Sequence, residues 1–283
     1  MNFDGNITDN FKFIEKIGKG SFGSVYKIID KNNKLYACKV ENKRQFAKHQ
    51  KQRLRGEYML YRRFHKHKIE CIPKTKCYIE TPKQNLLVME LMGHGLEYVL
   101  ENHGGKLDIE ITLKLGVEII SHIEQIHQTG IIHRDIKPNN FMFGVDENAS
   151  KLYIMDFGLS KMWCTNEGNH IEYKNNRSMI GTPRYASINV HMGIEPSRRD
   201  DMESIGYMLI FMATGSLPWQ GIRRKTKYNP IDKIGEKKMS TSSDMLCEGL
   251  PKCFSKFIDY TRKLGFIEKP DYQYLRSLFI ETT

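Results

Sequence analysis

The first third of the chain contains short segments rich in strand-forming residues, each separated from the next by turn-forming residues. These segments predict strands at residues 11–17, 24–30 and 34–40. The polar residues 31–34 are typical of a hairpin turn. A continuous apolar run at residues 86–90 stops at a glycine-containing turn, residues 93–95, and predicts a further, buried strand.

Longer segments later in the chain carry apolar residues at the three- and four-residue spacing of helices. Residues 109–129 have a broad apolar face, which predicts a buried helix that ends at Gly130. Residues 201–214 and 271–280 predict two more helices. With 283 residues, the chain is long enough for a large core and for two lobes around a cleft.

A helix is also predicted within residues 42–69, where Glu57 is the only acidic residue. The apolar face of this helix carries Leu54, Tyr61 and Phe64. Helical spacing puts Glu57 on the same face. An inward-facing carboxylate needs a partner, and Lys39, at the end of a predicted strand, is the obvious candidate. The alternatives are a solvated helix acid and an exposed lysine at a strand end.

The sequence GKGSFGSV at residues 18–25 lies between the first two predicted strands. Its glycines let backbone amides approach phosphate oxygens without obstruction by side chains. The spacing alone is a weak signal, because a simple glycine-rich hairpin is a fair alternative. A dinucleotide-binding fold would need a helix after the glycines, whereas a strand pattern follows here. The order strand, loop, strand is the one found around a kinase phosphate loop.

Two later stretches carry polar residues at fixed offsets, namely HRDIKPNN at residues 133–140 and, after a short interval, IMDFG. Asp135 can act as a general base, and Lys137 can stabilise a transferring phosphate. Asn140 and Asp156 offer the hard oxygen ligands that Mg²⁺ needs. A single aspartate in a loop is usually a turn residue, but four polar residues at these offsets disfavour that alternative. The two stretches resemble the catalytic loop and the metal-binding triplet of protein kinases.

Composition narrows the class of protein. Hydrophobic residues make up 40% and charged residues 27%, as in ordinary soluble proteins, and no apolar run reaches the length of a membrane span. The six cysteines form no Cys-x-x-Cys pair, which disfavours zinc and disulfides and indicates a reducing compartment. We expect a cytoplasmic location, with the nucleus as a further one. The net charge of +11 favours acidic or phosphorylated partners and could attract nucleic acid non-specifically.

Motifs in the second half of the chain indicate which group of protein kinases the sequence resembles. Residues 187–189 read SIN, where most protein kinases carry Ala-Pro-Glu. With four further motifs, this sequence resembles the casein kinase 1 family over nearly the whole chain, from about residue 11 to residue 279. The further motifs are SRRDDMESIGY (197–207), GSLPWQG (215–221), EKKMS (236–240) and KPDY (269–272).

The resemblance implies an α+β fold of two lobes. A small N-lobe would hold an antiparallel sheet, and a larger C-lobe would be mainly helical. The whole chain, residues 1–283, would be a single kinase domain. Its N-lobe would cover about residues 1–90, its hinge about 90–95 and its C-lobe about 96–283.

The resemblance further implies a Ser/Thr protein kinase that uses ATP and Mg²⁺. The catalytic residues would be Asp135, Lys137 and Lys39, and the metal ligands Asn140 and Asp156. In the family pattern Lys137 marks Ser/Thr rather than Tyr kinases, and Thr182 could contact both Asp135 and Lys137. The nucleotide would be bound by Ile17, Gly18, Gly20, Gly23, Val25, Ala37, Lys39, Glu57, Met89, Glu90 and Met92.

The same resemblance implies substrates with acidic or phosphorylated residues before the target Ser/Thr. Arg134, Lys161 and Arg177 would converge on an anion where other kinases hold a phosphorylated residue. We therefore expect activity without phosphorylation of the activation segment. The substrate side would also include Thr182, Arg184, Arg223 and Lys227. We expect a monomer with no specific nucleic-acid partner and no membrane partner.

Three positions depart from the family pattern. Gly93-His94-Gly95 replaces Gly-Pro-Ser after the hinge, which puts local stiffness in question. Asn139 replaces an aspartate that is not a metal ligand, so activity should survive. Pro230 replaces a phosphate-contacting lysine, so we expect a weaker dependence on a priming phosphate. Asp201 follows the family pattern, in which this residue hydrogen-bonds the backbone of the catalytic loop.

Two other functions remain as alternatives. A kinase-fold scaffold that binds ATP without turnover would lack a catalytic element, yet no member of the catalytic and metal-binding set is missing. A basic nucleic-acid-binding module would want aromatic residues interleaved with its basic ones. The basic run at residues 43–55 contains only Phe46, so this alternative ranks lowest.

Overall fold

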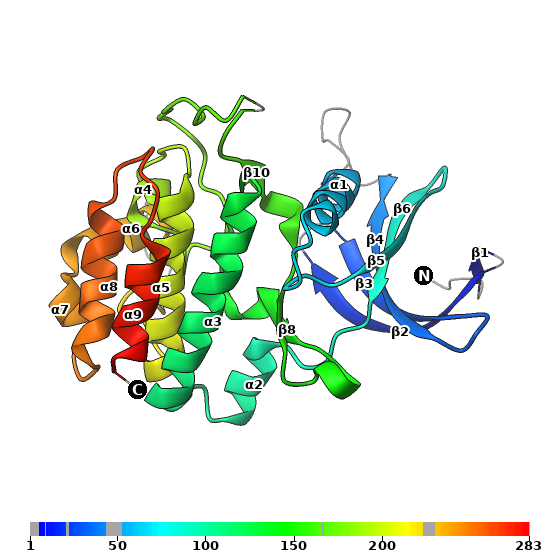
Figure 1. The fold of residues 1–283 in the computed structure, drawn as a ribbon, viewed down its shortest axis with the longest axis horizontal. Coiled ribbons are helices and arrows are strands. Elements are labelled where there is room, and N and C mark those ends of the chain that lie inside the picture. Colours follow the sequence, from blue (N-terminus) through cyan, green and yellow to red (C-terminus); the bar gives the residue numbers. More distant parts are fainter. Residues whose placement is uncertain are drawn as a thin grey trace. The chain divides into compact units, whose positions relative to one another are not determined.

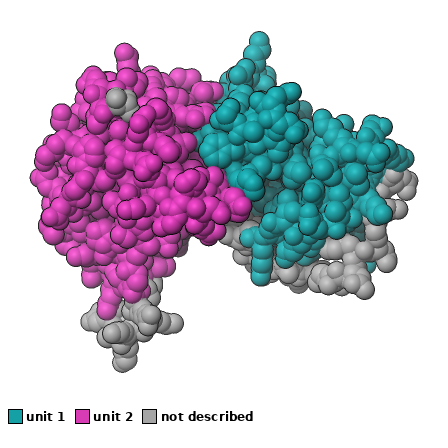
Figure 2. Space-filling model, turned by 90° about the horizontal axis from the view of Figure 1, so that it is seen from below, with its two compact units in different colours: residues 1–94, 142–158 teal, residues 95–141, 159–283 magenta. Residues whose placement is uncertain are grey.

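The computed structural model describes residues 6–8, 10–20, 23–43, 53–165, 167–222 and 230–282. The chain divides into two compact units (Figure 2). The first comprises the residues up to 94 together with 142–158, and the second comprises residues 95–141 and the residues from 159 onward. The expected lobe limits stay a prediction, and the sequence did not indicate that residues 142–158 join the first unit.

The first unit is built on an antiparallel sheet of six strands in the order β1-β2-β3-β4-β6-β5, among the residues described (Figure 1). Its strands are β1 (Asn6–Thr8), β2 (Phe11–Gly20), β3 (Gly23–Asp30), β4 (Leu35–Asn42), β5 (Thr75–Glu80) and β6 (Gln84–Glu90). The predicted strands are all present, although β2 runs on to Gly20 because it stays paired with β3 up to Gly23. The predicted hairpin turn is also present, with Asn33 at a positive φ of 59°.

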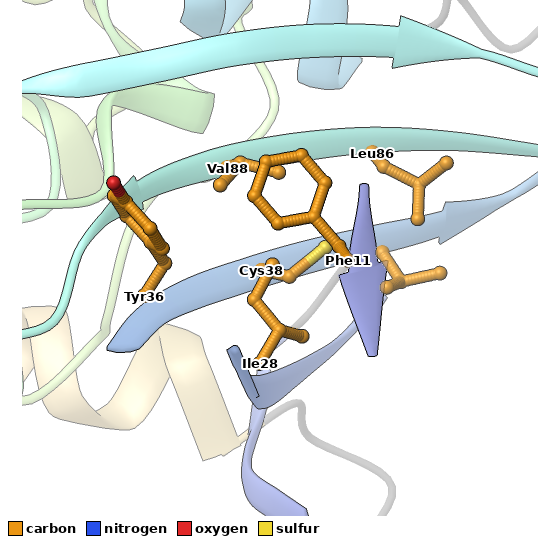
Figure 3. Packing of buried hydrophobic residues seen from close by; sticks show 7 residues of the cluster. Phe11, Ile28, Tyr36, Cys38, Leu86 and Val88 are labelled. Carbon is orange, nitrogen blue, oxygen red and sulfur yellow. The ribbon is translucent and has the colours of Figure 1, made fainter. Parts of the chain in front are cut away.

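The two faces of this sheet carry different residues, because successive side chains of a strand point to opposite sides. One face carries a buried apolar cluster (Figure 3). The cluster consists of Phe11, Ile28, Tyr36, Cys38, Val40, Leu86 and Val88. The residues between these positions face the other side, and the strand register pairs Val25 with Lys39 and Ala37 with Met89. Val25, Ala37, Lys39 and Met89 therefore share one face, whereas Glu90, which pairs with Tyr36, lies on the face of the cluster.

Helix α1 (Arg53–Lys66) completes the first unit together with residues 142–158. Its buried residues are Leu54, Glu57, Tyr61 and Phe64, which confirms the face predicted from helical spacing. In the second stretch, β8 (Phe141–Phe143) and β9 (Leu152–Ile154) form a two-stranded sheet. The backbone N–H of Ile154 donates to the Cys71 carbonyl, which ties β9 to the chain after α1.

The second unit is mainly helical. Its helices are α2 (Leu96–Asn102), α3 (Ile109–Gln128), α4 (Ile188–His191), α5 (Arg198–Thr214), α6 (Pro230–Ser240), α7 (Ser243–Leu246), α8 (Lys252–Lys263) and α9 (Tyr272–Ile280). Helix α3 packs against α5 and α9, and Figure 1 shows these three side by side. The unit also holds the short strands β7 (Ile131–Ile132) and β10 (Lys161–Met162), which pair with each other. The 3₁₀ turns that lie wholly within the described residues include η2 (Pro138–Asn140), η3 (Asp146–Asn148) and η4 (Phe157–Leu159).

The helix limits show where local sequence signals were sufficient. Gly130 follows the end of α3 at a positive φ of 85°, as its position predicted. Helix α5 begins at Arg198 rather than at Asp201, so the predicted start was wrong. The Asp200 carboxylate accepts a hydrogen bond from the Ser197 backbone N–H (2.7 Å), and this contact starts the helix earlier. The observed units confirm the predicted α+β class, with a sheet-rich N-terminal region and a helical C-terminal region.

No helix among the residues that the structure describes has the length and apolar character required to span a bilayer.

Candidate active site

Lys39 of β4, Glu57 of α1 and Asp156 form one ion-pair cluster in the first unit. The Lys39 Nζ lies 3.0 and 2.8 Å from the two carboxylate oxygens of Glu57 and 2.7 Å from Asp156 Oδ1. Glu57 is buried, whereas the Asp156 side chain is 35% exposed. The expected contact between Lys39 and Glu57 is therefore present, and the predicted metal ligand Asp156 lies beside it.

Burial and charge together set the ionisation of this cluster. Burial alone would lower the pKa of Lys39, but Glu57 and Asp156 outweigh it and raise that pKa. Burial raises the pKa of Glu57, and the Lys39 ammonium opposes this rise. Lys39 is therefore cationic at neutral pH, which a lysine that binds phosphate oxygens requires.

Phe157 fixes the position of Asp156. Its ring is buried against Tyr61 and Phe64 of α1, with ring centroids 5.2 and 4.7 Å away. Asp156 itself has a positive φ of 62°, a conformation that residues other than glycine rarely adopt and that clusters at functional sites. The packing of Phe157 on α1 thus holds a strained backbone that presents the Asp156 carboxylate to Lys39.

The expected nucleotide-binding residues lie on neighbouring strands of the sheet. Gly18 pairs with Val25, Val25 with Lys39, and Ala37 with Met89. Ala37, Met89 and Met92 are buried, whereas Ile17 is 46% exposed. The glycine-rich stretch is part of the β2–β3 hairpin, in which Gly20 pairs with Gly23. Ser21 and Phe22 lie outside the described residues.

Gly23 has a structural reason to be glycine besides any contact with phosphate. A Cβ atom at this position would lie 2.0 Å from the carbonyl oxygen of Val40 on β4. Any larger residue would therefore push β3 away from β4. Because Val25 and Lys39 pair across the same two strands, Gly23 also protects the placement of Lys39.

The segment after β6 is held by backbone hydrogen bonds. The N–H of Gly93 donates to the Phe143 carbonyl (2.8 Å), and the N–H of Phe143 donates to the His94 carbonyl (2.9 Å). A Cβ atom on Gly93 would lie 2.5 Å from the Gly144 carbonyl oxygen. The stiffness that the sequence put in question is thus supplied by strand β8 and by the close approach at Gly93.

In the second unit, three polar side chains surround Asp135: those of Lys137 and Asn140, from the same loop (residues 133–140), and that of Thr182. Thr182 Oγ1 donates to Asp135 Oδ1 (2.7 Å), and Lys137 Nζ donates to Asp135 Oδ2 (2.6 Å). Lys137 Nζ also reaches Thr182 Oγ1 (3.3 Å). The Asn140 amide donates to the Asp135 main-chain carbonyl (2.7 Å). The contacts expected of Thr182 with Asp135 and Lys137 are both present.

Hydrogen bonds to buried polar residues hold the loop from residue 133 to 140 in place. The Asp201 carboxylate accepts hydrogen bonds from the backbone N–H groups of His133 (2.7 Å) and Arg134 (2.8 Å). His127 Nε2 lies 2.9 Å from the same carboxylate, and its other ring nitrogen lies 2.7 Å from the Tyr272 hydroxyl. Burial alone would raise the pKa of Asp201, but the bonds from His127 and His133 outweigh it and lower that pKa. Asp201 therefore stays ionised and anchors the loop, as the family pattern implied.

Gly181 brings the segment that carries Thr182 against this loop. Its φ is 82°, and a Cβ atom would lie 2.4 Å from the Arg134 carbonyl oxygen. Both the backbone conformation and the close approach exclude other residues. Thr182 reaches Asp135 because Gly181 allows this approach.

A family model for the protein kinase domain matches residues 11–264. The chain belongs to the protein kinase family. This membership implies that the protein uses ATP and phosphorylates proteins. The matched span includes the Lys39 cluster in the first unit and the Asp135 loop in the second.

Two of the three bases that were expected to bind an anion meet on a carboxylate of the kinase itself. Lys161 Nζ lies 2.7 Å from Glu195 Oε1, and the Arg177 Nε lies 2.7 Å from Glu195 Oε2. Arg134, the third base, instead donates from Nε to the Leu159 carbonyl (2.6 Å). Burial alone would raise the pKa of Glu195, but Lys161 and Arg177 outweigh it and lower that pKa.

The remaining residues that were expected on the substrate side are only partly described. The Arg184 guanidinium lies over the rings of Phe211 (5.2 Å) and Tyr185 (5.7 Å) and is half-buried. Arg223 and Lys227 lie outside the described residues, so their expected contact with substrate stays a prediction.

Glu195 and His127, which contact the predicted site residues or their supports, were not indicated by the motifs. Glu195 lies 34 residues from Lys161 and 18 from Arg177. His127 lies 145 residues from its partner Tyr272. Both sit in segments whose local pattern is explained by a turn or a helix end, so only their burial in the folded chain identifies them.

Proposed function

We propose that this protein is a Ser/Thr protein kinase of the casein kinase 1 type, which transfers the γ-phosphate of ATP to proteins with acidic or already phosphorylated residues near the target. The observation that carries this proposal is the arrangement of Asp135, Lys137 and Thr182. The Asp135 carboxylate can accept the hydroxyl proton and receives hydrogen bonds from Thr182 and Lys137. Lys137 can in addition bind the transferring phosphate.

The residues of the two units would have different roles in the reaction. Lys39 would bind the α- and β-phosphates, and Glu57 orients its ammonium. Asp135 would accept, or at least orient, the substrate hydroxyl proton, while Lys137 would offset the charge on the transferring group. The adenine edge would meet the backbone between residues 90 and 92. The Glu90 N–H already donates to the Lys74 carbonyl, so the remaining polar groups of this segment would serve the base.

Asp156 in the first unit and Asn140 in the second each have the chemistry of a magnesium ligand. Asp156 offers a partly exposed carboxylate, and Asn140 uses its amide nitrogen on the Asp135 carbonyl, which leaves its oxygen as the ligand atom. Bound Mg²⁺ would neutralise charge on the ATP phosphates. Lys39 and Phe157 hold Asp156 in position for that role.

The preference for Ser/Thr rests on Lys137 and Thr182. In the family pattern, a lysine two residues after the catalytic aspartate distinguishes Ser/Thr kinases from Tyr kinases. Here that lysine contacts both Asp135 and Thr182, which supports this role.

Activity without phosphorylation of the activation segment is supported by Glu195. In the family, an anion replaces a phosphorylated residue of that segment. In this chain the buried Glu195 carboxylate already holds Lys161 and Arg177 together. Arg184, which is half-buried, would then face the acidic or primed part of the substrate. With Pro230 in place of a lysine, the requirement for priming would be weaker than is usual for the family.

Phosphate transfer to acidic, primed and unprimed serine peptides tests this proposal, with Asp135→Asn as the matched variant. Loss of a general base costs roughly 10²–10⁴-fold in rate, so this variant should be nearly inactive while its ATP binding stays near the wild-type value. Near-normal turnover of Asp135→Asn would contradict the role of Asp135. Nucleotide binding by the wild type without any transfer would favour the scaffold alternative.

A further inference from the structure

Lys238 of α6 is a fully buried lysine that no step of the proposed reaction uses. Its side chain is 0% exposed. The ammonium donates to the main-chain carbonyl of Pro183 (2.8 Å) and to that of Ala186. A buried charge is costly unless its hydrogen bonds are satisfied, and these acceptors are backbone carbonyls rather than carboxylates. Lys238 is therefore placed to hold a particular stretch of backbone.

Two aromatic rings enclose the same ammonium. Lys238 Nζ lies 4.9 Å from the ring centroid of Tyr207 and 5.0 Å from that of Trp219, within the range of cation–π attraction. Trp219 also donates from its indole Nε1 to the Arg184 carbonyl (2.8 Å). Lys238 and Trp219, which we call the carbonyl clamp, thus hold the carbonyls of residues 183, 184 and 186.

The clamped stretch begins directly after Thr182. Thr182 Oγ1 donates to Asp135 Oδ1, so a shift of the neighbouring backbone would move a group that touches the catalytic carboxylate. His191 contacts the same carbonyl as Lys238, because its Nε2 lies 3.2 Å from the Pro183 carbonyl oxygen. That oxygen can only accept, so Nε2 carries the proton. The clamp therefore acts on the backbone between Thr182 and Ala186.

We propose that the carbonyl clamp, with Lys238 as its centre, is a positioning device for phosphoryl transfer: it fixes the backbone of residues 183–186 so that Thr182 stays on Asp135 and Arg184 stays at the substrate side. This gives a role to the motif EKKMS, which the sequence singled out without one. The proposal rests on the proposed kinase activity and adds residues that touch neither ATP nor the reacting atoms.

Lys238→Met tests the proposal, with Lys237→Met as its matched control. Methionine keeps most of the side-chain length and removes the donors, whereas Lys237 is an exposed lysine on the same helix. We expect Lys238→Met to lower kcat on a serine peptide roughly tenfold or more, since small misplacements of reacting groups have effects of this size. The KM for ATP should stay within about twofold of wild type. Rates are normalised to protein that binds nucleotide.

Amide hydrogen exchange of residues 183–187 gives a second readout. The clamp predicts faster exchange there in Lys238→Met and unchanged exchange in Lys237→Met. Equal kcat and equal exchange in both variants would overturn the proposal. A purely structural role would lower the amount of nucleotide-binding protein but leave the normalised kcat unchanged, which also contradicts the proposal.

If Lys238→Met does not unfold cooperatively, Trp219→Phe tests the proposed clamp instead. This variant keeps a ring beside Lys238 and removes the indole N–H that donates to the Arg184 carbonyl. It should lower kcat with little change in the KM for ATP, and unchanged kcat and exchange would overturn the proposal. If the wild-type protein transfers no phosphate at all, the proposed function fails. The exchange of residues 183–187 then still tests whether the clamp holds this backbone.

Discussion

Glu195 shows how one side chain can organise a segment of the kinase. Its buried carboxylate accepts from Lys161 and from Arg177, which lie at two separate points of the segment after residue 159. The Glu195 backbone N–H also donates to the Lys174 carbonyl (2.8 Å), and the Arg177 N–H donates to the Gly193 carbonyl (2.8 Å). Main-chain and side-chain bonds therefore join the same two stretches, and the carboxylate is their charged centre.

Removing the charge of Glu195 should loosen this segment. Because its folded pKa is lowered, Glu195 stabilises the fold fully above its ordinary pKa of 4.5, and this contribution disappears as pH falls through the folded pKa. We expect Glu195→Gln to lower kcat roughly tenfold at pH 7 and to reduce the free energy of unfolding at neutral pH but not in strong acid. Peptide assays and urea unfolding at several pH values measure this.

Glu172→Gln is the matched control, since the Glu172 carboxylate is exposed and the lysine that lies 3.5 Å from it is exposed as well. Normal turnover in Glu195→Gln would contradict the role of Glu195, as would a stability difference that does not change with pH.

At this scale, sequence reasoning succeeded where chemistry lies in one contiguous motif or on one helical face. Lys39 and Glu57 were paired because Glu57 stands alone on an apolar stripe, and the structure confirms that contact. Glu195 and Lys238 could not be found in this way. Each is a charged residue in a polar stretch, which is usually solvated, and only the folded chain buries it.

Helix α1 is held by strand β4 at two points. Glu41 of β4 is buried, and its Oε1 accepts from the first backbone N–H groups of the helix, those of Arg53 (3.0 Å) and Leu54 (3.3 Å). Its Oε2 accepts from the Asn85 amide (2.9 Å). The first turn of α1 has no acidic residue of its own, so Glu41 supplies the negative charge that a helix N-terminus favours. Lys39, two residues earlier on the same face of the strand, binds Glu57 one turn further along.

Loss of this cap should therefore affect both stability and catalysis. Glu41→Ala should reduce the free energy of unfolding by about 1 kcal/mol, the usual cost of a lost N-terminal cap. It should also lower kcat/KM for ATP several-fold, because α1 carries Glu57. Thermal unfolding, ATP kinetics and amide exchange of residues 53–57 measure these effects. Glu80→Ala, on β5 with an exposed carboxylate, is the control, and identical behaviour of the two variants would refute the argument.

The elements themselves were largely predictable, and their ends were not. The strands and long helices were recognised from spacing and turn residues, which depend on neighbours in the chain. The start of α5 was missed because it depends on the side chain of Asp200, which had been taken for a residue before the helix. Likewise, β2 extends to Gly20 because of its partner strand, which a single segment cannot reveal.

For the molecule as a whole, each compact unit has its own buried charged groups that are held by hydrogen bonds. The first unit has Lys39, and the second has Asp201 and, further along the chain, Lys238. The sequence indicated a sheet-rich and a helical part but did not assign residues 142–158 to the first unit. That assignment depends on contacts such as those of Phe157 with Tyr61 and Phe64, which are far apart in the sequence.

Lys238 should make the stability of the whole chain depend on pH. Burial lowers the pKa of Lys238 to about 7 from an ordinary value of 10.5, with Glu203 opposing the shift and Arg262 adding to it. Two further titratable groups face it. They are Tyr207, whose pKa is raised well above its usual value by burial, and His191, whose pKa burial lowers to about 4. Neither changes charge between pH 7 and 9, so Lys238 dominates the local titration there.

Between pH 7 and 10.5 the unfolded chain binds more protons at Lys238 than the folded chain does. The free energy of unfolding should therefore gain a contribution that rises with pH across this window. The two carbonyl oxygens and two rings around the ammonium favour its charged form and reduce the size of this rise. Urea unfolding at pH 7, 8 and 9 should show the contribution in the wild type and in Lys237→Met but not in Lys238→Met. Parallel pH curves for all three proteins would mean that Lys238 keeps its proton throughout, held by its carbonyl and aromatic cage.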